Sequence, residues 1–299
     1  MKDKVKETKR IDFREQISRN KWKSLFFMFV IFSVLVVLGW VIARAFSPEY
    51  FYMILVFAII FSLVYILISY YKSDKIALAS VGAREAGRSE YKQFYNAAEG
   101  LAIASGLPMS KLYVMPSEQI NAFASGRDPG HSVICVTEGA LKKLDKRELE
   151  GVISHELSHI SNYDIRYMAL TAVMVGMISI ISQIFLRSLY FRGNDRDRGK
   201  GNAIFMLIGV ILAILAPIAV YFVQMAISRK REFAADASAV KFTRYPPGLI
   251  NALTKIKQEN QPEKRINKAI APLFFVNPFE ELGSTHPDID KRIEVLKRM

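Results

Sequence analysis

The residues with the clearest chemical potential are His155, Glu156 and His159, which form the pattern H-E-x-x-H. In a helix this spacing places both imidazoles on one face, one turn apart, where two ring nitrogens can bind one zinc ion. Glu156 points around the helix and could take a proton from a water molecule at the metal without being a ligand. The pattern therefore predicts hydrolysis of a peptide bond, whereas the alternative is two histidines that line a solvated helix face.

A hydrolytic zinc site needs a third protein ligand and leaves a fourth position for water. We prefer Glu232 as this ligand, because it begins a helical stretch and has Asp236 one turn further on. Asp236 could then orient one of the ligating histidines. His131 and His286 remain alternative ligands, and a plain juxtamembrane charge cluster is the alternative interpretation of Glu232 and Asp236. We expect one zinc ion per chain.

Four long blocks without a charged residue divide the chain, at residues 24–43, 50–71, 167–186 and 201–228. Each block is long enough as a helix to cross about 30 Å of hydrocarbon, which predicts about four membrane helices. The first block exceeds a signal-peptide core and lacks a small-x-small cleavage site. The net charge of +13 fits basic membrane flanks, and without a basic stripe interleaved with aromatic residues we expect no nucleic acid partner.

Charge also orients the chain in the membrane. The first 23 residues carry nine basic and four acidic side chains, which places the N-terminus in the cytoplasm. Two blocks lie between His159 and Glu232, so an even number of crossings allows both to share one ion. The loop at residues 187–200 has five basic residues against two acidic ones, which is unusual for an external loop. The third and fourth blocks could therefore form a shallow hairpin instead.

These boundaries predict five regions. They are a cytoplasmic basic N-terminus (1–23), a transmembrane hairpin (24–71), the first part of a metalloprotease domain (72–166), a second hydrophobic hairpin (167–228) and the second part of that domain (229–299).

Local patterns predict the elements that position the motif. Helices are expected at residues 76–105, 138–143 with Thr137 as N-cap, 146–163 and 287–297. A further helix is expected to continue from the fourth apolar block through Val240 and to break at Pro246 and Pro247. Short β-rich runs at residues 111–115, 120–123 and 132–136 predict a small antiparallel sheet beside the H-E-x-x-H helix. The single cysteine, Cys135, lies in an apolar run and is predicted to be a buried strand residue.

Four separated motifs resemble the HtpX family of membrane zinc endopeptidases, which are relatives of the CAAX prenyl proteases. They are Asn121-Ala122-Phe123-Ala124-Ser125-Gly126, the H-E-x-x-H pattern followed by Asp164, Ser228 to Phe233 with Asp236, and Ser284-Thr285-His286-Pro287 with Arg292. The resemblance implies an α+β, mostly helical integral membrane zincin that binds zinc through His155, His159 and Glu232 and uses Glu156 as catalytic base. It also implies a cytoplasmic active site in a bacterial plasma membrane and a role in quality control of membrane proteins.

The same resemblance implies roles for residues outside the metal motif. Asn121 and Ala122 resemble the edge strand with which such peptidases pair the substrate backbone, although a plain core strand is the alternative. By resemblance to the prenyl proteases, His286 and Arg292 could donate hydrogen bonds to the oxyanion of the tetrahedral intermediate. Otherwise His286 caps the terminal helix and Arg292 is a solvated base. The expected partners are protein or peptide substrates and the lipid bilayer.

Two other functions are alternatives. A non-catalytic zinc-stabilised membrane scaffold or holdase would keep the metal without hydrolysis, but structural zinc sites use four protein ligands, and only three are found beside Glu156. A prenyl-protein protease is disfavoured, because that architecture needs more than four membrane helices.

Overall fold

The computed structural model describes residues 13–46, 51–172, 209, 211, 229–259, 273–276 and 287–299. The elements of the first part are α1 (Phe13–Phe46), α2 (Phe51–Tyr71), α3 (Ser73–Ser80), β1 (Arg84–Glu85), α4 (Lys92–Ser105), β2 (Lys111–Met115), β3 (Ala122–Asp128) and β4 (His131–Thr137). They are followed by α5 (Glu138–Lys143), α6 (Lys146–Ser161), α9 (Arg229–Thr243), α10 (Pro246–Glu259) and α11 (Ile289–Leu296). Residues 164–172 are also helical.

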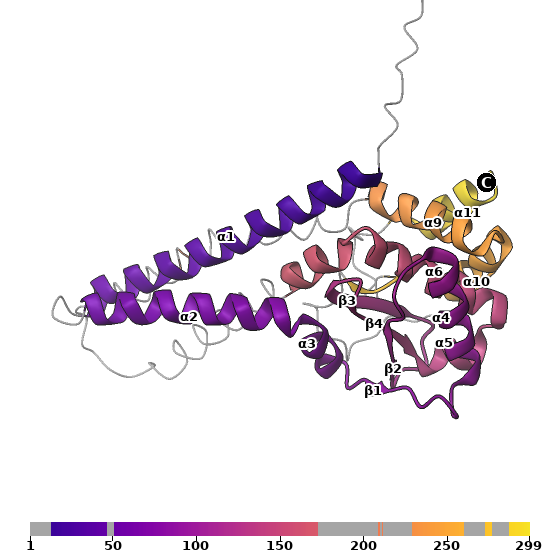
Figure 1. The fold of residues 1–299 in the computed structure, drawn as a ribbon, viewed down its shortest axis with the longest axis horizontal. Coiled ribbons are helices and arrows are strands. Elements are labelled where there is room, and N and C mark those ends of the chain that lie inside the picture. The colour runs from indigo at the N-terminus through magenta and orange to yellow at the C-terminus, as the bar shows by residue number, and fades with distance from the viewer. Residues whose placement is uncertain are drawn as a thin grey trace, which may run out of the picture.

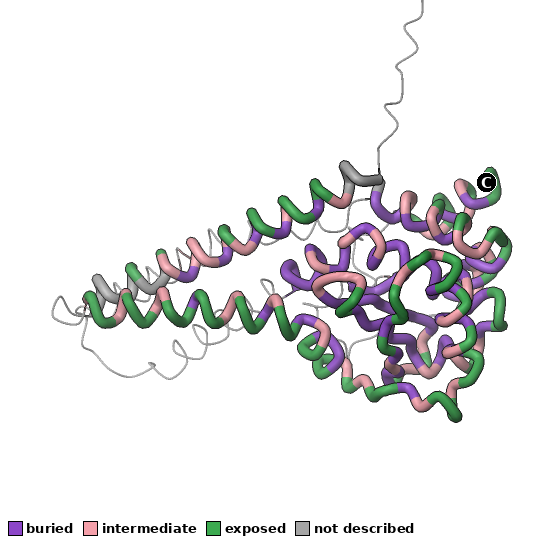
Figure 2. The backbone as a smooth tube through the Cα atoms, in the orientation of Figure 1, coloured by how far each residue is buried: buried purple, intermediate pink, exposed green. Residues whose placement is uncertain are grey.

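Two long apolar helices, α1 and α2, run side by side and project from the body that holds the sheet (Figure 1). Segments Ile17–Val37 and Phe51–Tyr71 are long and apolar enough to cross a membrane. Large apolar side chains of α2 are exposed, among them Tyr52 at 78% and Phe57 at 68%, and Figure 2 shows how little of this helix is buried. Because a core helix of a soluble domain would cover such residues, this hairpin is suited to an apolar solvent.

The third and fourth predicted membrane blocks, residues 167–186 and 201–228, fall almost entirely outside the described residues. Only residues 167–172 of the third block and residues 209 and 211 of the fourth are described. The basic loop at residues 187–200 also lies outside them.

The sheet has four strands in the order β1-β2-β4-β3. β1 is antiparallel to β2 and β3 is antiparallel to β4, but β2 and β4 are parallel. The prediction of an antiparallel sheet is therefore wrong, since the sheet is mixed. β4 contains the continuous apolar run at residues 133–136 and takes a position where strands pair with both of its edges. A fully apolar strand favours such an interior position, so β3 lies beyond β4 instead of between β2 and β4.

β3 is longer than the predicted strand at residues 120–123, because Gly126 continues it. Gly126 has φ +141°, and a Cβ atom there would lie 2.2 Å from the carbonyl oxygen of His131. The glycine lets the two strands approach at a bulge near Asp128. The strand therefore extends to Asp128, beyond the predicted end at residue 123.

The prediction of one helix at residues 76–105 is also wrong, because this range contains α3, β1 and α4. α3 ends before Gly82, which has φ +63°, and residues Arg84–Glu85 pair with β2 before α4 begins. The remaining local predictions are confirmed in outline. The Thr137 hydroxyl accepts a hydrogen bond from the Ala140 amide at the start of α5, and α10 begins at Pro246. α6 begins with a capping box between Asp145 and Glu148.

Alternate side chains of the sheet enter two cores. Ile134 and Val136 pack with residues of α4, α6 and α10, whereas Val133 and Cys135 pack with residues of α3 and with Met168. Cys135 is a buried free thiol, as predicted, and burial raises its pKa.

α6 lies within the first of these cores, and residues 151–160 of this helix are all buried. At Gly151 a Cβ atom would lie 2.7 Å from the Leu249 backbone nitrogen, so α10 packs directly on the backbone of α6. This packing makes α6 a rigid platform for its side chains.

Candidate metal centre

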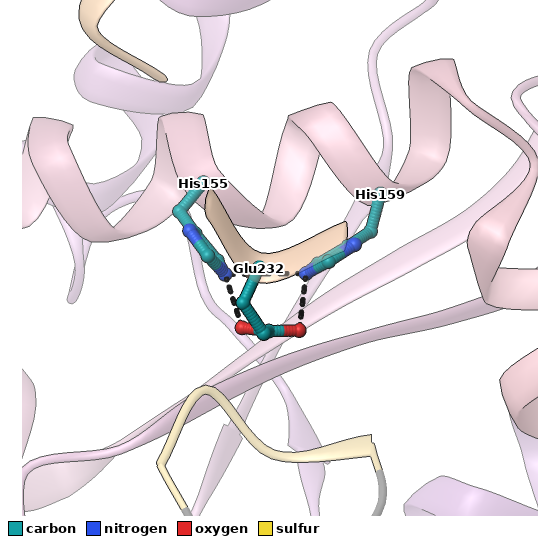
Figure 3. A group of neighbouring side chains, drawn as sticks. All are labelled: His155, His159 and Glu232. Carbon is teal, nitrogen blue, oxygen red and sulfur yellow. Dashed lines mark hydrogen bonds and ion pairs between the residues drawn. The ribbon is translucent and has the colours of Figure 1, made fainter. Parts of the chain in front are cut away.

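α6 and α9 bring three candidate ligands together. His155 and His159 point from one side of α6 towards the carboxylate of Glu232 on α9 (Figure 3). The two Nε2 atoms are 3.1 Å apart. Glu232 Oε2 lies 3.4 Å from His155 Nε2, and Glu232 Oε1 lies 3.7 Å from His159 Nε2.

These distances fit a zinc ion. Zinc binds imidazole nitrogen at about 2.0–2.1 Å, so two nitrogens of a tetrahedral site lie about 3.3 Å apart. All three side chains are buried. The nearby Glu156 is buried too, and its Oε1 atom has no hydrogen-bond partner among the described residues. Two imidazoles and one carboxylate are a ligand set that zinc uses in hydrolytic sites, and the unpaired oxygen of Glu156 beside them could accept a proton from water.

Each imidazole has a carboxylate behind it. His155 Nδ1 donates to Asp236 Oδ1 at 2.9 Å. Burial lowers the pKa of His155, but hydrogen bonds with Asp236 and Glu232 outweigh it and raise the pKa to about 9. The Nδ1 contact fixes the orientation of the ring and leaves Nε2 facing the metal site.

Asp236 is held in turn by Arg292, whose residue exposure is 1%. Arg292 Nε donates to Asp236 Oδ2 at 2.9 Å and Nη2 donates to Oδ1 at 2.7 Å. Burial raises the pKa of Asp236, but Arg292 and His155 reverse this and hold it below its usual range. A third donor, Arg292 Nη1, reaches the carbonyl oxygen of Phe275 at 3.3 Å. Arg292 is therefore a buried, paired side chain and not a solvated base.

His159 has the corresponding partner in Asp164. His159 Nδ1 donates to Asp164 Oδ2 at 3.2 Å. The other carboxylate oxygen, Oδ1, accepts from Asn20 Nδ2 at 2.7 Å and lies 3.3 Å from Arg231 Nη1. Sequence reasoning named Asp164 only within a motif and missed Asn20. The available signal was an amide at the basic end of an otherwise apolar helix.

Glu156 faces β3. Burial raises the pKa of its carboxyl group, and the imidazoles of His155 and His159 oppose that rise. A hydrogen bond from the Ala124 backbone also favours the ionised form. The carboxylate is thus placed between the metal site and the edge strand of the sheet.

Asn121 directly precedes β3 and Ala122 begins it. The backbone of Asn121 pairs with Thr137 of β4, whereas its side chain and the Ala122 carbonyl face the edge that does not pair with β4. The Ala122 carbonyl accepts from the Phe275 amide at 2.8 Å. The Asn121 side chain donates to the Val276 carbonyl at 2.9 Å and accepts from the Val276 amide at 3.2 Å. Phe123 forms an isolated antiparallel bridge with Phe274. This edge can pair with an extended peptide, and residues 274–276 already do so.

Two further histidines are alternative ligands in the sequence, and the structure describes one of them. His286 lies outside the described residues. His131 is exposed and pairs with Asp128 at 2.8 Å, on the far end of β3 and β4. It is therefore not part of the ligand group formed by His155, His159 and Glu232.

Comparison with known proteins assigns the class. Residues 88–299 match the model of peptidase family M48, so the chain belongs to this family of zinc metallopeptidases. It is 44% identical to the "Protease HtpX homolog" of Dictyoglomus turgidum over 292 residues. This alignment covers 96% of this chain and 95% of the relative. The homolog from Lactobacillus helveticus is 37% identical over 297 residues, or 95% of this chain and 99% of the relative.

Within the family the chain is an HtpX-type zinc metalloprotease. Its fold is similar to that of Ste24p from S. mikatae, with a TM-score of 0.51 and 20% sequence identity. This likeness covers 95% of the chain and 67% of Ste24p, and it concerns the fold alone.

Proposed function

We propose that the chain is an endopeptidase of the bacterial plasma membrane that cleaves membrane or misfolded proteins, with its N-terminus and catalytic domain in the cytoplasm. The observation that carries the proposal is the buried group of His155, His159 and Glu232 beside Glu156, joined through Asn20 to a helix suited to a membrane. The candidate span begins at Ile17, so Asn20 belongs to the span and to the surroundings of the site at once. Substrates at the membrane surface are therefore within reach.

The proposed roles follow from this geometry. His155, His159 and Glu232 would hold zinc, which supplies a Lewis acid that polarises the scissile carbonyl and lowers the pKa of a water molecule. Glu156 accepts a proton from the attacking water and returns it to the leaving amine. Asp236 and Asp164 keep the two imidazoles oriented with Nε2 towards the site.

The first experiment replaces Glu156 with Gln in the full chain, purified in detergent. The glutamine keeps the size of the side chain but cannot accept the proton, so we expect at least about a 100-fold loss of peptide cleavage with zinc still bound. Glu150→Gln, the same change on α6 at a residue paired with Arg147, is the matched control and should cleave normally. Zinc-loaded wild-type protein that cleaves no peptide would instead support the scaffold or holdase.

For the substrate we propose strand addition along the outer edge of β3, at the side chain of Asn121 and the backbone of Ala122. Residues 274–276 occupy the hydrogen-bonding groups of this edge, so a substrate strand must displace them or replace their bonds. Hydrogen exchange of the Phe275 amide tests this in Glu156→Gln, which binds peptide without cleaving it. Faster exchange with saturating peptide is expected, and unchanged exchange at Phe275 would place the substrate elsewhere.

The oxyanion roles of His286 and Arg292 stay predictions. The contacts of Arg292 with Asp236 and Phe275 support a positioning role through Asp236. His286→Ala should lower kcat and retain zinc if the imidazole donates to the oxyanion. Unchanged turnover would leave His286 as a helix cap.

A further inference from the structure

Asn20 is a buried amide in a membrane-type helix that contacts the catalytic domain. Its residue exposure is 3%, although it lies within the candidate span Ile17–Val37. Its Nδ2 atom donates to the Asn162 carbonyl at 3.0 Å and to Asp164 Oδ1 at 2.7 Å. Both acceptors are more than 140 residues away in sequence. A polar side chain is costly in such a helix, so a fully used pair of hydrogen bonds indicates a specific role.

The segment that Asn20 contacts is a tight turn under strain. Residues 162–164 connect α6 to the next helix, and Tyr163 in the middle of the turn has φ +59°, which is unfavourable for a side chain of this size. Strained backbone persists only where its surroundings hold it. Asn20 holds the carbonyl before Tyr163, and the Lys21 ammonium group lies 4.4 Å from the centre of the Tyr163 ring. α1 therefore braces this turn from outside.

The braced turn carries Asp164, which orients His159. Asp164 uses Oδ2 for His159 Nδ1 and Oδ1 for Asn20 and Arg231. Asn20 thus fixes the rotation of the carboxylate from the side opposite the imidazole. The amide adds no charge of its own, so it acts on Asp164 through the direction of its hydrogen bond.

We propose that Asn20 is a positioning residue for the metal ligand His159, so that the seating of the first membrane helix against the catalytic domain sets the geometry and affinity of the zinc site. This rests on the proposed role of His159 as a ligand. Direct partners of a ligand typically change metal affinity 10- to 100-fold. Asn20 acts one bond further out, so its loss should weaken zinc binding by about tenfold.

The test uses the full chain in detergent with Asn20→Leu, which keeps a similar volume and removes both hydrogen bonds. The zinc dissociation constant is measured by competition with a chelator, and the ligand geometry by the visible spectrum of the Co²⁺-substituted protein. We expect the dissociation constant to rise about tenfold and the Co²⁺ bands to shift. Ser24→Ala is the matched control, since Ser24 is equally buried one turn further along α1 but donates only to the Asn20 carbonyl of its own helix.

The possible outcomes separate positioning from plain anchoring. A lower Tm for Asn20→Leu with wild-type zinc affinity and Co²⁺ spectrum would show that Asn20 only fastens α1, and would overturn the proposal. If Asn20→Leu does not fold, Asn20→Gln keeps the amide but moves it by one methylene group, and should still alter the Co²⁺ spectrum. A wild-type spectrum of Asn20→Gln, with wild-type affinity, would then reject the proposal. Wild-type protein that binds no zinc at His159 would reject the proposed metal site itself.

Discussion

Each histidine of the metal centre is oriented by a buried aspartate, but the two aspartates are held by different groups. On the side of His155, Asp236 is held by two charge-assisted bonds from Arg292, which belongs to the C-terminal helix α11. On the side of His159, Asp164 is held by the neutral amide of Asn20 from α1, with Arg231 at 3.3 Å. The imidazole contact is also shorter on the first side, 2.9 Å against 3.2 Å.

We call His155, with Asp236 and Arg292, the locked side of the metal centre, and His159, with Asp164 and Asn20, the adjustable side. Two bonds from one planar guanidinium fix both oxygens of Asp236, whereas the amide of Asn20 bonds to one oxygen of Asp164. The locked side depends on the packing of the catalytic domain. The adjustable side depends on a helix whose other partner is the membrane.

Removing the ligand shared by both sides should have the largest effect. Glu232→Ala leaves two imidazoles, which hold zinc poorly, so zinc affinity should fall by more than the roughly 100-fold that outer partners can account for. Equilibrium dialysis with metal analysis measures this loss. Stoichiometric zinc at wild-type affinity in this variant would transfer the third ligand elsewhere, with His286 as the first candidate.

Breaking the locked side should unfold the protein most readily. Arg292→Met leaves Asp236 buried without its cation, and loss of one partner of a buried ion pair destabilises by roughly 3–5 kcal/mol. Thermal unfolding in detergent reports the change. Arg298→Met, which removes an exposed arginine paired with Glu294 from the same end of the chain, should melt like the wild type. An Arg292→Met variant that melts at the wild-type temperature would show that the guanidinium does not lock this side of the centre.

The two carboxylates can be compared directly. Asp236→Ala should weaken zinc binding towards the upper end of the 10- to 100-fold range, because it removes the shorter imidazole contact and strands Arg292. Asp164→Ala should weaken zinc binding by an amount near the lower end of the same 10- to 100-fold range. Chelator competition on both variants ranks them, and the reverse order would contradict the assignment of His155 as the locked ligand.

The smallest effect tests which contact of α11 matters. Lys257 on α10 pairs with Asp290 on α11 at 2.6 Å, but both side chains are more than half exposed. An exposed ion pair contributes little, so Lys257→Ala should change the free energy of unfolding by less than about 0.5 kcal/mol and leave zinc affinity unaltered. A loss comparable with that of Arg292→Met would mean that docking of α11, and not the buried guanidinium, secures the site.

The sequence predicts the metal centre better than the features around it. His155, His159 and Glu232 could be found because helical periodicity and ligand chemistry are local properties. Asn20 could not be found, and Asp164 was named only within a motif, since their contact depends on a left-handed residue at Tyr163 and on the docking of α1. Arg292 could be named from a motif, but its burial against Asp236 depends on long-range packing.

The same distinction applies to the sheet. Strand β2 was predicted with its observed bounds, because its pattern is local. The pairing order was not, since hydrogen bonding between strands allows several arrangements and only the burial of β4 selects one. Gly126 and Gly82 show the same limit, because one continues a strand and the other ends a helix.

The position of Arg292 near the end of the chain has a consequence for biosynthesis. Arg292 follows Asp236 by 56 residues, and the carboxylate lacks the guanidinium of Arg292 until α11 is synthesised. At about 5–20 residues per second, translation takes about 3 to 11 s to cover that distance. A growing chain that already contains both histidines and Glu232 still lacks the clamp on His155 during this interval. The contacts that orient His155 are therefore completed only after α11 has been synthesised.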